Sequence, residues 1–422
     1  MKRFLILLVL LAMALSFAPT STEPVAKAQD DNVLEIYITG LTEGPMAWFQ
    51  DVAFPAFQED HPDVELEILT GGWGDFDVTV AGWITTGDGP DIVYLGSEYA
   101  ATYGDLLADL DPYLSDWDEL DAFLPAALET ATWDGHLRGL PLLMSPRPIF
   151  WRTDLAVGAD DGYPTDFDSA LDFYDANSVV EDGAMVKMGF MDIGGSLFDW
   201  QEFLGYIWSA GGELYNEDGT STFDNDITAQ VLEYMYERRR IMMPDETVTG
   251  LPAFDGTPIA SDLVVSGIFP MWGMPPVDDE IWDNIGIAPY PAGAEGEPIV
   301  QVYTDWLSVP AYVEDPTLAV EFLKFITSQE NALALSEVAG FTPVRTDAWE
   351  EIRANSEVWD RLLDSAVEYG RGFNDIRASA QLHGLITDQI ALYLTDQQSL
   401  EDTQANLKAE YDLILEENGY LD

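Results

Sequence analysis

In the first hundred residues, segments whose hydrophobic pattern is typical of strands alternate with segments whose apolar residues have helical spacing. Three short segments read as strands, and the last of them, 92–95, is apolar throughout, as in a strand covered on both faces. Between these segments, apolar residues recur at helical spacing. The connections are long enough for parallel pairing, so the pattern predicts a strand–helix–strand–helix–strand unit of an α/β fold. The predicted strands are 33–38, 64–69 and 92–95, and the predicted helices are 48–57 and 76–84.

The segment 84–98 marks one end of this unit. Gly87 and Gly89 can end a helix in the left-handed conformation, and Pro90 cannot continue one. Glu98 follows the apolar strand at its carboxyl end. Ligands bind at that edge of open α/β sheets, so we expect a ligand site beside Glu98.

The remainder of the chain continues this alternation with more helix. Asp134-Gly135 predicts the turn of a short hairpin within 133–141. The chain has no internal repeat and no low-complexity linker, which favours lobes that it crosses between more than once. Further predicted strands are 149–151 and 264–271. Further predicted helices are 123–130, 198–210, 227–241, 316–326, 332–339 and three or four segments from 348 to the end.

The first residues are typical of a secretory signal peptide. Lys2 and Arg3 precede an apolar run, and Ala26-Lys27-Ala28 offers a small-x-small cleavage site, so we expect residues 1–28 to be removed. No Cys follows the run, which argues against a lipid anchor. No later stretch reaches the ~18 apolar residues that a spanning helix needs. We therefore expect an exported, periplasmic or extracellular protein that does not span the membrane.

The charge balance is extreme. The chain has 77 Asp and Glu against 17 Lys and Arg, a net charge of −60, and losing residues 1–28 would leave about −62. Such a field disfavours nucleic acid and anionic lipid as partners. Adaptation to high salt or to acid explains it most simply, whereas attraction of a cationic ligand and a set of calcium sites are alternatives. No segment matches the D-x-[DN]-x-[DN]-G calcium loop.

Six motifs, in order and spacing, resemble the extracellular solute-binding proteins of ABC importers, within the large sugar-binding family typified by maltose-binding protein. The resemblance covers nearly the whole chain after residue 28. The motifs are Gly87-Asp88-Gly89-Pro90-Asp91-Ile92-Val93, Gly139-Leu140-Pro141 with Phe150-Trp151-Arg152-Thr153-Asp154-Leu155, residues 211–219, Gly267-Ile268-Phe269-Pro270-Met271-Trp272-Gly273, residues 319–326, and Gly340-Phe341-Thr342-Pro343.

This resemblance implies a two-lobed, type II-like periplasmic-binding-protein fold with a ligand cleft between the lobes. Lobe I would comprise 29–140 plus 299–340, and lobe II would comprise 141–298 plus 341–422. Hinge crossings would lie near 140–148, 284–298 and 340, and the lobes would close on the ligand.

The resemblance also implies which loops line the cleft. Leu95 and His383 stand where maltose-binding protein has cleft tryptophans, which argues against a linear glucan. Aromatic faces suit the C–H patches of a sugar, and polar side chains suit its hydroxyls. Several candidates have a plainer alternative: an indole can pack within a lobe, and Arg147 or Arg377 can form a structural ion pair. The candidate ligand-binding residues are Thr42, Glu43, Trp73, Glu98, Arg147, Asp199, Trp200, Trp272, Asp305, Trp306 and Arg377.

Enzyme classes are disfavoured. The chain has no Cys and three His, and no G-x-S-x-G, P-loop or G-x-G-x-x-G motif. Paired carboxylates could hydrolyse glycosides, but with 77 acids some pair always lies at a suitable distance. The resemblance to the solute-binding proteins therefore implies a monomeric binding protein, without metal or cofactor, that captures a mono- or oligosaccharide and delivers it to a permease. A polyamine or other cationic solute is the alternative ligand, and a secreted glycoside-acting enzyme is the alternative activity.

Overall fold

The strands predicted in the first hundred residues form, and they pair in parallel. β1 (Val33–Thr39) lies between β2 (Glu65–Gly71) and β3 (Ile92–Gly96), and every residue of β3 is buried. The helix α4 (Phe76–Thr86) ends at Gly87 with φ +66°, as its glycine predicted. The computed structural model describes residues 33–182, 184–192, 200–242, 258–269, 279–355, 357–373 and 375–421, so the expected signal peptide lies outside it.

Seven strands of the described residues form the larger sheet. Its order is β13–β6–β12–β3–β1–β2, with β14 beside β12, which runs antiparallel to both β3 and β6. A smaller sheet has the order β10–β7–β11. The predicted hairpin is also present, as β4 (Thr132–Trp133) and β5 (His136–Leu137). The bounds are β6 (Gly139–Arg147), β7 (Ile149–Arg152), β8 (Val179–Glu181), β9 (Ala184–Lys187), β10 (Ser266–Ile268), β11 (Ile285–Ala288), β12 (Val300–Ser308), β13 (Thr342–Pro343) and β14 (Gly370–Gly372).

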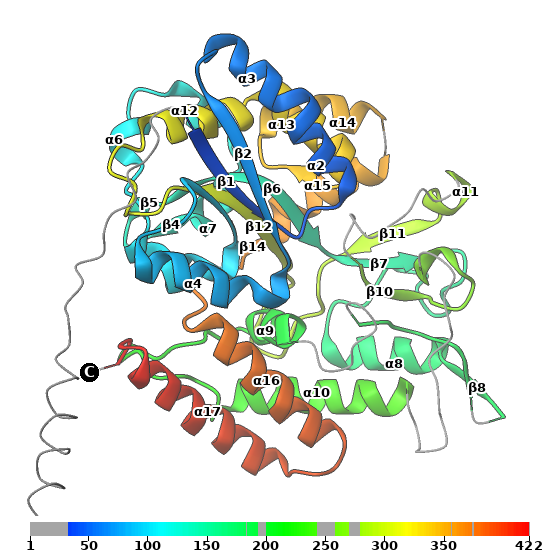
Figure 1. Cartoon of the computed structure of the whole chain (residues 1–422). Helices are drawn as coiled ribbons and strands as arrows, with labels where there is room; N and C mark the ends of the chain where they lie inside the picture. Colours follow the sequence, from blue (N-terminus) through cyan, green and yellow to red (C-terminus); the bar gives the residue numbers. More distant parts are fainter. Residues whose placement is uncertain are drawn as a thin grey trace, which may run out of the picture.

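Helices surround these sheets in two lobes (Figure 1). The lobe built on the larger sheet carries the first helices of the chain, and the other lobe carries the last two. The helices of the first lobe include α2 (Glu43–Trp48), α3 (Phe54–Asp60), α5 (Ala100–Tyr103), α6 (Asp111–Leu114), α7 (Pro125–Thr130), α12 (Thr317–Ile326), α13 (Gln329–Ala339) and α14 (Trp349–Asn355). Those of the second include α8 (Phe167–Asn177), α9 (Trp200–Ser209), α10 (Asp226–Met242), α16 (Ser379–Leu394) and α17 (Leu400–Glu417), while α11 (Asp279–Trp282) follows the smaller sheet and α15 (Glu357–Tyr369) leads into β14.

Each lobe has its own apolar core. One large cluster of buried side chains draws on residues 34–143 and 306–335, and the other draws on 149–303 and 362–415. A third, smaller cluster joins Met144, Val302 and Trp349. Separate cores are what two bodies that can move relative to each other require.

The lobe boundaries expected from the sequence, 29–140 plus 299–340 and 141–298 plus 341–422, stay a prediction. We propose one change to them. β13 pairs with β6 of the larger sheet, and Trp349 of α14 belongs to the small cluster beside that sheet. Residues 342–355 therefore pack with the first lobe rather than with the second.

Two strands connect the lobes. At the carboxyl end of β3, Gly96 pairs with Asp305, whereas β12 and β6 continue beyond this point to the pair Gln301–Arg147. The C-terminal end of the chain makes a further contact with the first lobe, because the Tyr420 hydroxyl donates a hydrogen bond to the Ala101 carbonyl oxygen at 3.0 Å. The lobes are thus held together by paired backbone and by contacts at one edge.

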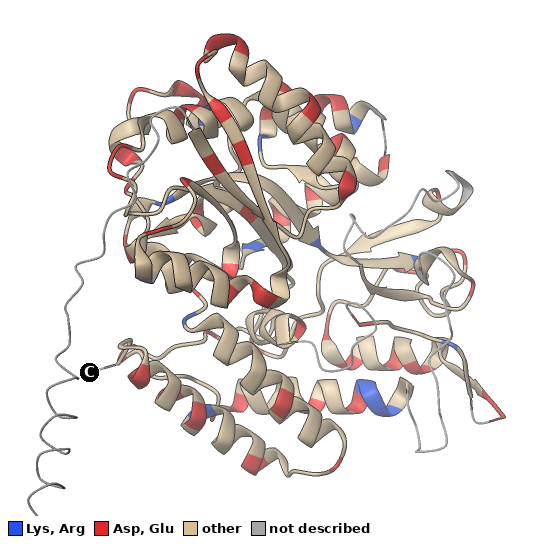
Figure 2. Cartoon of the chain, viewed as in Figure 1, with Lys and Arg blue, Asp and Glu red and all other residues tan. Residues whose placement is uncertain are grey.

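Acidic side chains are spread over both lobes, and basic ones are sparse (Figure 2). Arg238 of α10 is fully buried between Asp192 and Glu202. Its Nη2 lies 2.5 Å from Asp192 Oδ1, and its Nη1 lies 3.3 Å from Glu202 Oε1 and donates to the Tyr206 hydroxyl at 2.9 Å. One guanidinium thus holds two buried carboxyl groups at either side of residues 193–199.

Replacing Arg238 with methionine should strongly destabilise the second lobe. Two carboxyl groups would lose their buried counterion, and breaking a buried pair in this way costs about 3–5 kcal/mol. Urea unfolding followed by circular dichroism measures the loss. Arg240→Met is the matched control, because Arg240 is exposed on the same helix and its loss should change stability by less than about 0.5 kcal/mol. Equal effects of the two substitutions would contradict the assigned role of the buried cluster.

Candidate functional site

The carboxyl ends of β1, β2 and β3 meet at one edge of the larger sheet, as parallel pairing requires. Thr42 and Glu43 follow β1 at the start of α2, and both are exposed. Trp73 follows β2 and is 40% exposed, and Glu98 follows β3 and is half-buried. Four of the candidate residues therefore come together at the edge where ligands bind in open α/β sheets.

Two glycines make room for side chains at this edge. Gly40 has φ +71°, and a Cβ there would lie 2.1 Å from Nε1 of Trp73. A Cβ on Gly96 would lie 2.5 Å from Oε2 of Glu98. Since neither glycine has a Cβ, the Trp73 indole covers the end of β1 and the Glu98 carboxyl group folds back over the end of β3.

The strands that connect the lobes add a second group of polar side chains. Tyr303 and Asp305 lie on the same face of β12. Arg147 of β6 pairs with Gln301, which is the next residue of β12 on that face, so Arg147 lies on it too. The Arg147 guanidinium lies 3.7 Å from the centre of the Tyr303 ring. The Tyr94 hydroxyl donates a hydrogen bond to Asp305 Oδ2 at 2.8 Å. Arg147 and Asp305 are thus held beside Glu98.

Asp77 of α4 completes a group that we call the carboxyl cluster: Asp77, Glu98 and Asp305. The carboxylate oxygens of Asp77 accept long hydrogen bonds from the hydroxyls of Tyr99 and Tyr103, at 3.5 and 3.4 Å. The rings of Tyr99 and Trp73 are nearly parallel, at 5° and 6.3 Å between centroids. Tyr99 and Tyr103 are buried, so of these three rings Trp73 is the exposed one.

Burial raises the pKa of all three members of the carboxyl cluster. The pKa of Glu98 rises to about 7, because desolvation and repulsion by Asp305 and Asp77 outweigh its backbone hydrogen bond and the attraction of Arg147. The pKa of Asp305 rises to about 6, since desolvation outweighs the Tyr94 hydrogen bond and Arg147. The pKa of Asp77 is also raised by desolvation, against the effect of Tyr103, Tyr99 and His383. The cluster therefore carries less negative charge near neutral pH than three exposed acids would.

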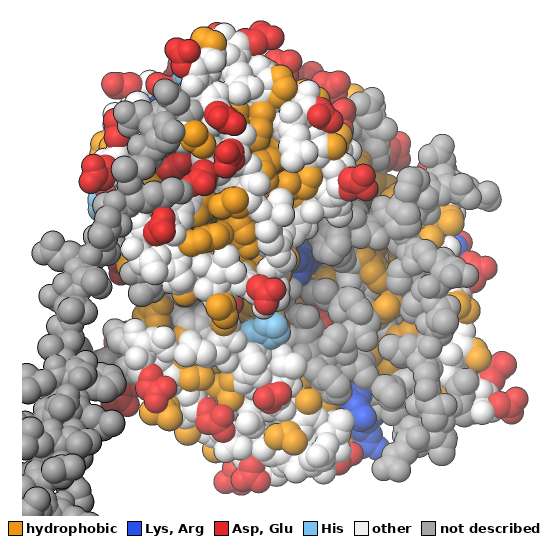
Figure 3. Space-filling view, viewed as in Figure 1, with side chains coloured by type: hydrophobic (Ala, Val, Ile, Leu, Met, Phe, Trp, Pro, Cys, Tyr) orange, Lys and Arg blue, Asp and Glu red, His pale blue; other side chains and the backbone are white. Residues whose placement is uncertain are grey.

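The second lobe reaches this group through α9 and α16. Gln201 Oε1 accepts a hydrogen bond of 2.5 Å from Arg147 Nη1. Trp200 is buried and stacks on His383 at 5.0 Å between ring centroids, and His383 interacts electrostatically with Asp77 of the first lobe. Acidic, basic and histidine side chains meet along the boundary between the lobes in the space-filling view (Figure 3).

Other candidates lie apart from this group or outside the described residues. Trp306 is fully buried in the core of the first lobe, where its Nε1 donates to the Gly96 carbonyl oxygen at 3.2 Å, so it offers no surface to a ligand. Its neighbour Asp305 points the other way, because successive strand residues face opposite sides. Asp199 and Trp272 lie outside the described residues.

Arg377 belongs to a different hollow. Its guanidinium lies 4.1 Å from the centre of the Tyr215 ring, and its Nε donates to Asp375 Oδ1 at 3.3 Å. Arg371 and Glu213 line the same hollow and form an ion pair of 2.6 Å. The structural ion pair considered for Arg377 is therefore present.

The sequence analysis missed Asp77, Tyr99 and Tyr103 as members of the site. Tyr99 directly follows Glu98, and Asp77 lies four residues after Trp73, so nearness to two candidates was the available signal. Asp77 lies in α4, which the sequence predicted, but its approach to Tyr99 and Tyr103 depends on the short helical turns after β3, which carry no hydrophobic pattern of their own.

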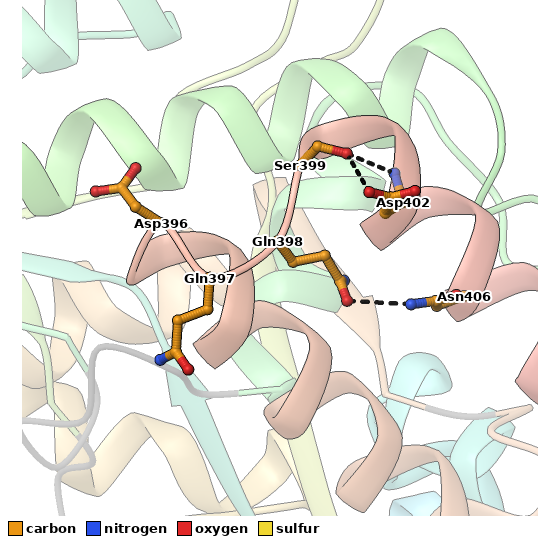
Figure 4. Close-up of a pocket in the computed structure, with 6 residues that line it drawn as sticks. All are labelled: Asp396, Gln397, Gln398, Ser399, Asp402 and Asn406. Atoms are coloured by element: carbon orange, nitrogen blue, oxygen red, sulfur yellow. Dashed lines mark hydrogen bonds between the residues drawn. The ribbon is translucent and has the colours of Figure 1, made fainter.

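Two other polar groups have simple structural explanations. The pocket at the turn between α16 and α17 is lined by side chains that bond one another: the Ser399 hydroxyl bonds Asp402 at 2.7 Å and caps α17, and Asn406 donates to Gln398 at 3.1 Å (Figure 4). Asp109, Asp111 and His136 are grouped closely enough to hold a metal ion. The imidazole Nδ1 already lies 3.1 and 3.0 Å from the two carboxylates, so contacts within the group account for its arrangement.

Ligand-free protein should lose stability as the pH rises from about 4.5 to about 7. In this window the Glu98 carboxyl holds its proton in the folded protein but not in the unfolded chain, so the folded state binds more protons. The stabilisation is complete below the pKa of Glu98 in the unfolded chain. It is lost as the pH rises through the raised pKa of Glu98 in the folded protein. Glu98→Gln should flatten this part of the melting temperature–pH curve.

The matched control is Glu67→Gln, an exposed residue on β2. General repulsion among the acids also lowers stability as pH rises, and this variant removes one charge without touching the cluster. If Glu98→Gln and Glu67→Gln give the same slope, the proposed burial effect at Glu98 is wrong.

Solved structures of similar fold were found across almost the whole chain. T. maritima MalE3 with bound maltose has a TM-score of 0.71 at 20% identity, covering 91% of this chain and 100% of that one. CpMnBP1 with bound mannotriose has a TM-score of 0.72 at 18% identity, covering 90% and 99%. The GacH receptor of Streptomyces glaucescens, solved unliganded and with acarbose, has a TM-score of 0.69 at 20% identity, covering 91% and 98%. The predicted two-lobed fold is thereby confirmed.

Sequence comparisons agree with the fold. An uncharacterised ABC transporter extracellular-binding protein of Pyrococcus horikoshii is 21% identical over 365 residues, which cover 82% of this chain and 80% of that protein. The model of the bacterial extracellular solute-binding proteins matches residues 39–333, well over half of the chain. The chain therefore belongs to the family of bacterial extracellular solute-binding proteins.

Proposed function

We propose that this protein captures a carbohydrate outside the cytoplasm and delivers it to the permease of an ABC importer. The supporting observation is the edge of β1–β3, where the exposed Trp73 indole lies beside the carboxyl cluster and Arg147. Rings of this kind suit the C–H face of a sugar, and the polar groups suit its hydroxyls.

The relatives support the same ligand class. Maltose, mannotriose and acarbose are bound in the similar structures, and the Pyrococcus protein carries the name of an ABC transporter component. The family is one of binding proteins, and we propose no catalytic step. In this proposal Trp73, Glu98, Arg147 and Asp305 contact the sugar, with Thr42 and Glu43 at the rim and Trp200 behind His383. Asp199 and Trp272 remain proposed contacts.

Location and assembly follow from the proposed role. The family is extracellular, and residues 1–28 would direct export. Among the helices of the described residues, none combines the length and the apolar character that crossing a membrane demands. We propose a monomer whose lobes close on the ligand through the strands β6 and β12.

A screen of mono-, di- and trisaccharides tests the proposal. A bound sugar should raise the melting temperature, because it stabilises the folded state by mass action. It should also change the tryptophan fluorescence through Trp73. No response to any sugar in a broad panel would contradict the proposal.

Trp73→Ala should weaken binding of the sugar found in that screen by about ten- to a hundredfold, since an aromatic platform contributes roughly 1.5–3 kcal/mol of burial. Titration calorimetry measures the change. Tyr113→Ala is the control, because Tyr113 of α6 is about as exposed as Trp73, at 38% against 40%, but lies away from the strand edge. Unchanged affinity in Trp73→Ala would exclude Trp73 from the site.

A further inference from the structure

Gly40 lies against the pyrrole edge of the Trp73 indole. A Cβ on Gly40 would lie 2.1 Å from Nε1 of Trp73 and 2.9 Å from both Cδ1 and Cε2 of the same ring. Real Cβ atoms essentially never come this close to a neighbour, so any side chain at residue 40 must displace the indole. Gly40 directly follows β1, so the backbone at the end of that strand is the surface on which the ring edge rests.

The backbone at Gly40 is itself held in place. Its φ of +71° lies in the left-handed region, which favours glycine. Its amide donates a hydrogen bond to the Gly71 carbonyl oxygen at 3.4 Å, and the Thr39 hydroxyl donates to the same oxygen at 3.2 Å. Thr39 and Gly71 are also the last pair in the register of β1 and β2. The end of this strand pair therefore fixes Gly40, and Gly40 limits where the indole lies.

Three rings from the core of the first lobe pack against the same indole. The Trp73 ring centroid lies 5.3 Å from that of Phe76 and 6.3 Å from those of Tyr94 and Tyr99. These three partners are at most 7% exposed, whereas Trp73 is 40% exposed. The indole is thus seated on buried rings and on Gly40, and the rest of its surface faces solvent.

The glycines on either side of Trp73 make no such contact. A Cβ on Gly72 or on Gly74 would meet no atom within 4 Å. Gly72 also has φ −110°, which other residues adopt without strain. Among Gly40, Gly72 and Gly74, only Gly40 therefore constrains the indole by contact.

We propose that Gly40 is a positioning residue for ligand binding, which holds the Trp73 indole in the orientation that contacts the sugar. The inference rests on the proposed carbohydrate function and adds a residue to it. A larger residue at position 40 pushes the indole off the end of β1, because the ring is the far end of a side chain and moves more easily than paired backbone. The platform must then be ordered again when the sugar binds, which lowers affinity.

A plainer role for Gly40 is backbone conformation alone, since alanine at this φ is strained wherever the ring lies. Gly87 of the same lobe separates the two roles. It has φ +66°, and a Cβ there would lie 3.8 Å from the Tyr312 Cβ, which is an ordinary contact. Gly40→Ala therefore combines strain with displacement of the indole, whereas Gly87→Ala produces the strain alone.

Sugar affinity tests the inference. Calorimetry with glucose, galactose, mannose, maltose, cellobiose and mannotriose as probes identifies a sugar that the unaltered protein binds. Gly40→Ala should weaken binding of that sugar by about tenfold, at the lower end of the loss expected for Trp73→Ala. Gly87→Ala and Gly72→Ala should leave the affinity unchanged, although Gly87→Ala should lower the melting temperature as Gly40→Ala does.

A double variant shows whether the effect passes through the indole. In the Trp73→Ala background there is no indole to displace, so Gly40→Ala should cause no further loss of affinity. The NMR signal of the Trp73 indole N–H, identified by its absence from Trp73→Phe, gives a readout that needs no sugar. This signal should move in Gly40→Ala and stay in place in Gly87→Ala.

The outcomes separate this inference from the proposed function. If a sugar binds and Gly40→Ala keeps full affinity, leaves the indole signal in place, or loses as much affinity without Trp73 as with it, the positioning role is overturned and the carbohydrate function stands. If no sugar binds to the unaltered protein, both are overturned. Should Gly40→Ala fail to fold, Gly40→Asn replaces it, because asparagine accepts the left-handed conformation more readily and still carries a Cβ.

Discussion

The pairing of β12 with both β3 and β6 is the constraint on which the rest of the molecule depends. β12 begins beside the core of the second lobe and ends in the core of the first, so one strand belongs to both bodies. Asp305 lies where β3 stops, and Arg147 and Tyr303 lie on the part that continues. The same backbone hydrogen bonds that join the lobes therefore place charged groups at their boundary.

Local features then shape the edge of the larger sheet. Glycines at the strand ends leave space that an indole and a carboxyl group occupy, and tyrosine hydroxyls hold the neighbouring acids. The result is a surface whose carboxyl groups are partly desolvated and so have raised pKa values. If this is the ligand site, as proposed, its affinity should depend on the charge of the ligand as well as on its shape.

The sequence predicted the parallel unit of β1, β2 and β3 because its apolar periods are distinct and Gly87 ends a helix in the left-handed conformation. It predicted Trp73 and Glu98 at the strand edge for the same reason. It did not separate Asp305 from Trp306, since only the register of β12 shows which of two neighbours faces the core. The place of residues 342–355 also depended on a two-residue pairing, which carries no hydrophobic pattern of its own.

Where Tyr420 bonds the Ala101 carbonyl, and where His383 approaches Asp77, the second lobe touches the first without any shared backbone. If the lobes move apart as proposed, these contacts would break while the strands stay paired. A hydrogen bond of this kind contributes only about 1 kcal/mol, so each one changes the ratio of shut to open molecules by roughly fivefold. In the proposed motion, such weak contacts at the edge would help to set the balance between open and closed molecules, so substitutions there should change how readily the protein releases its ligand.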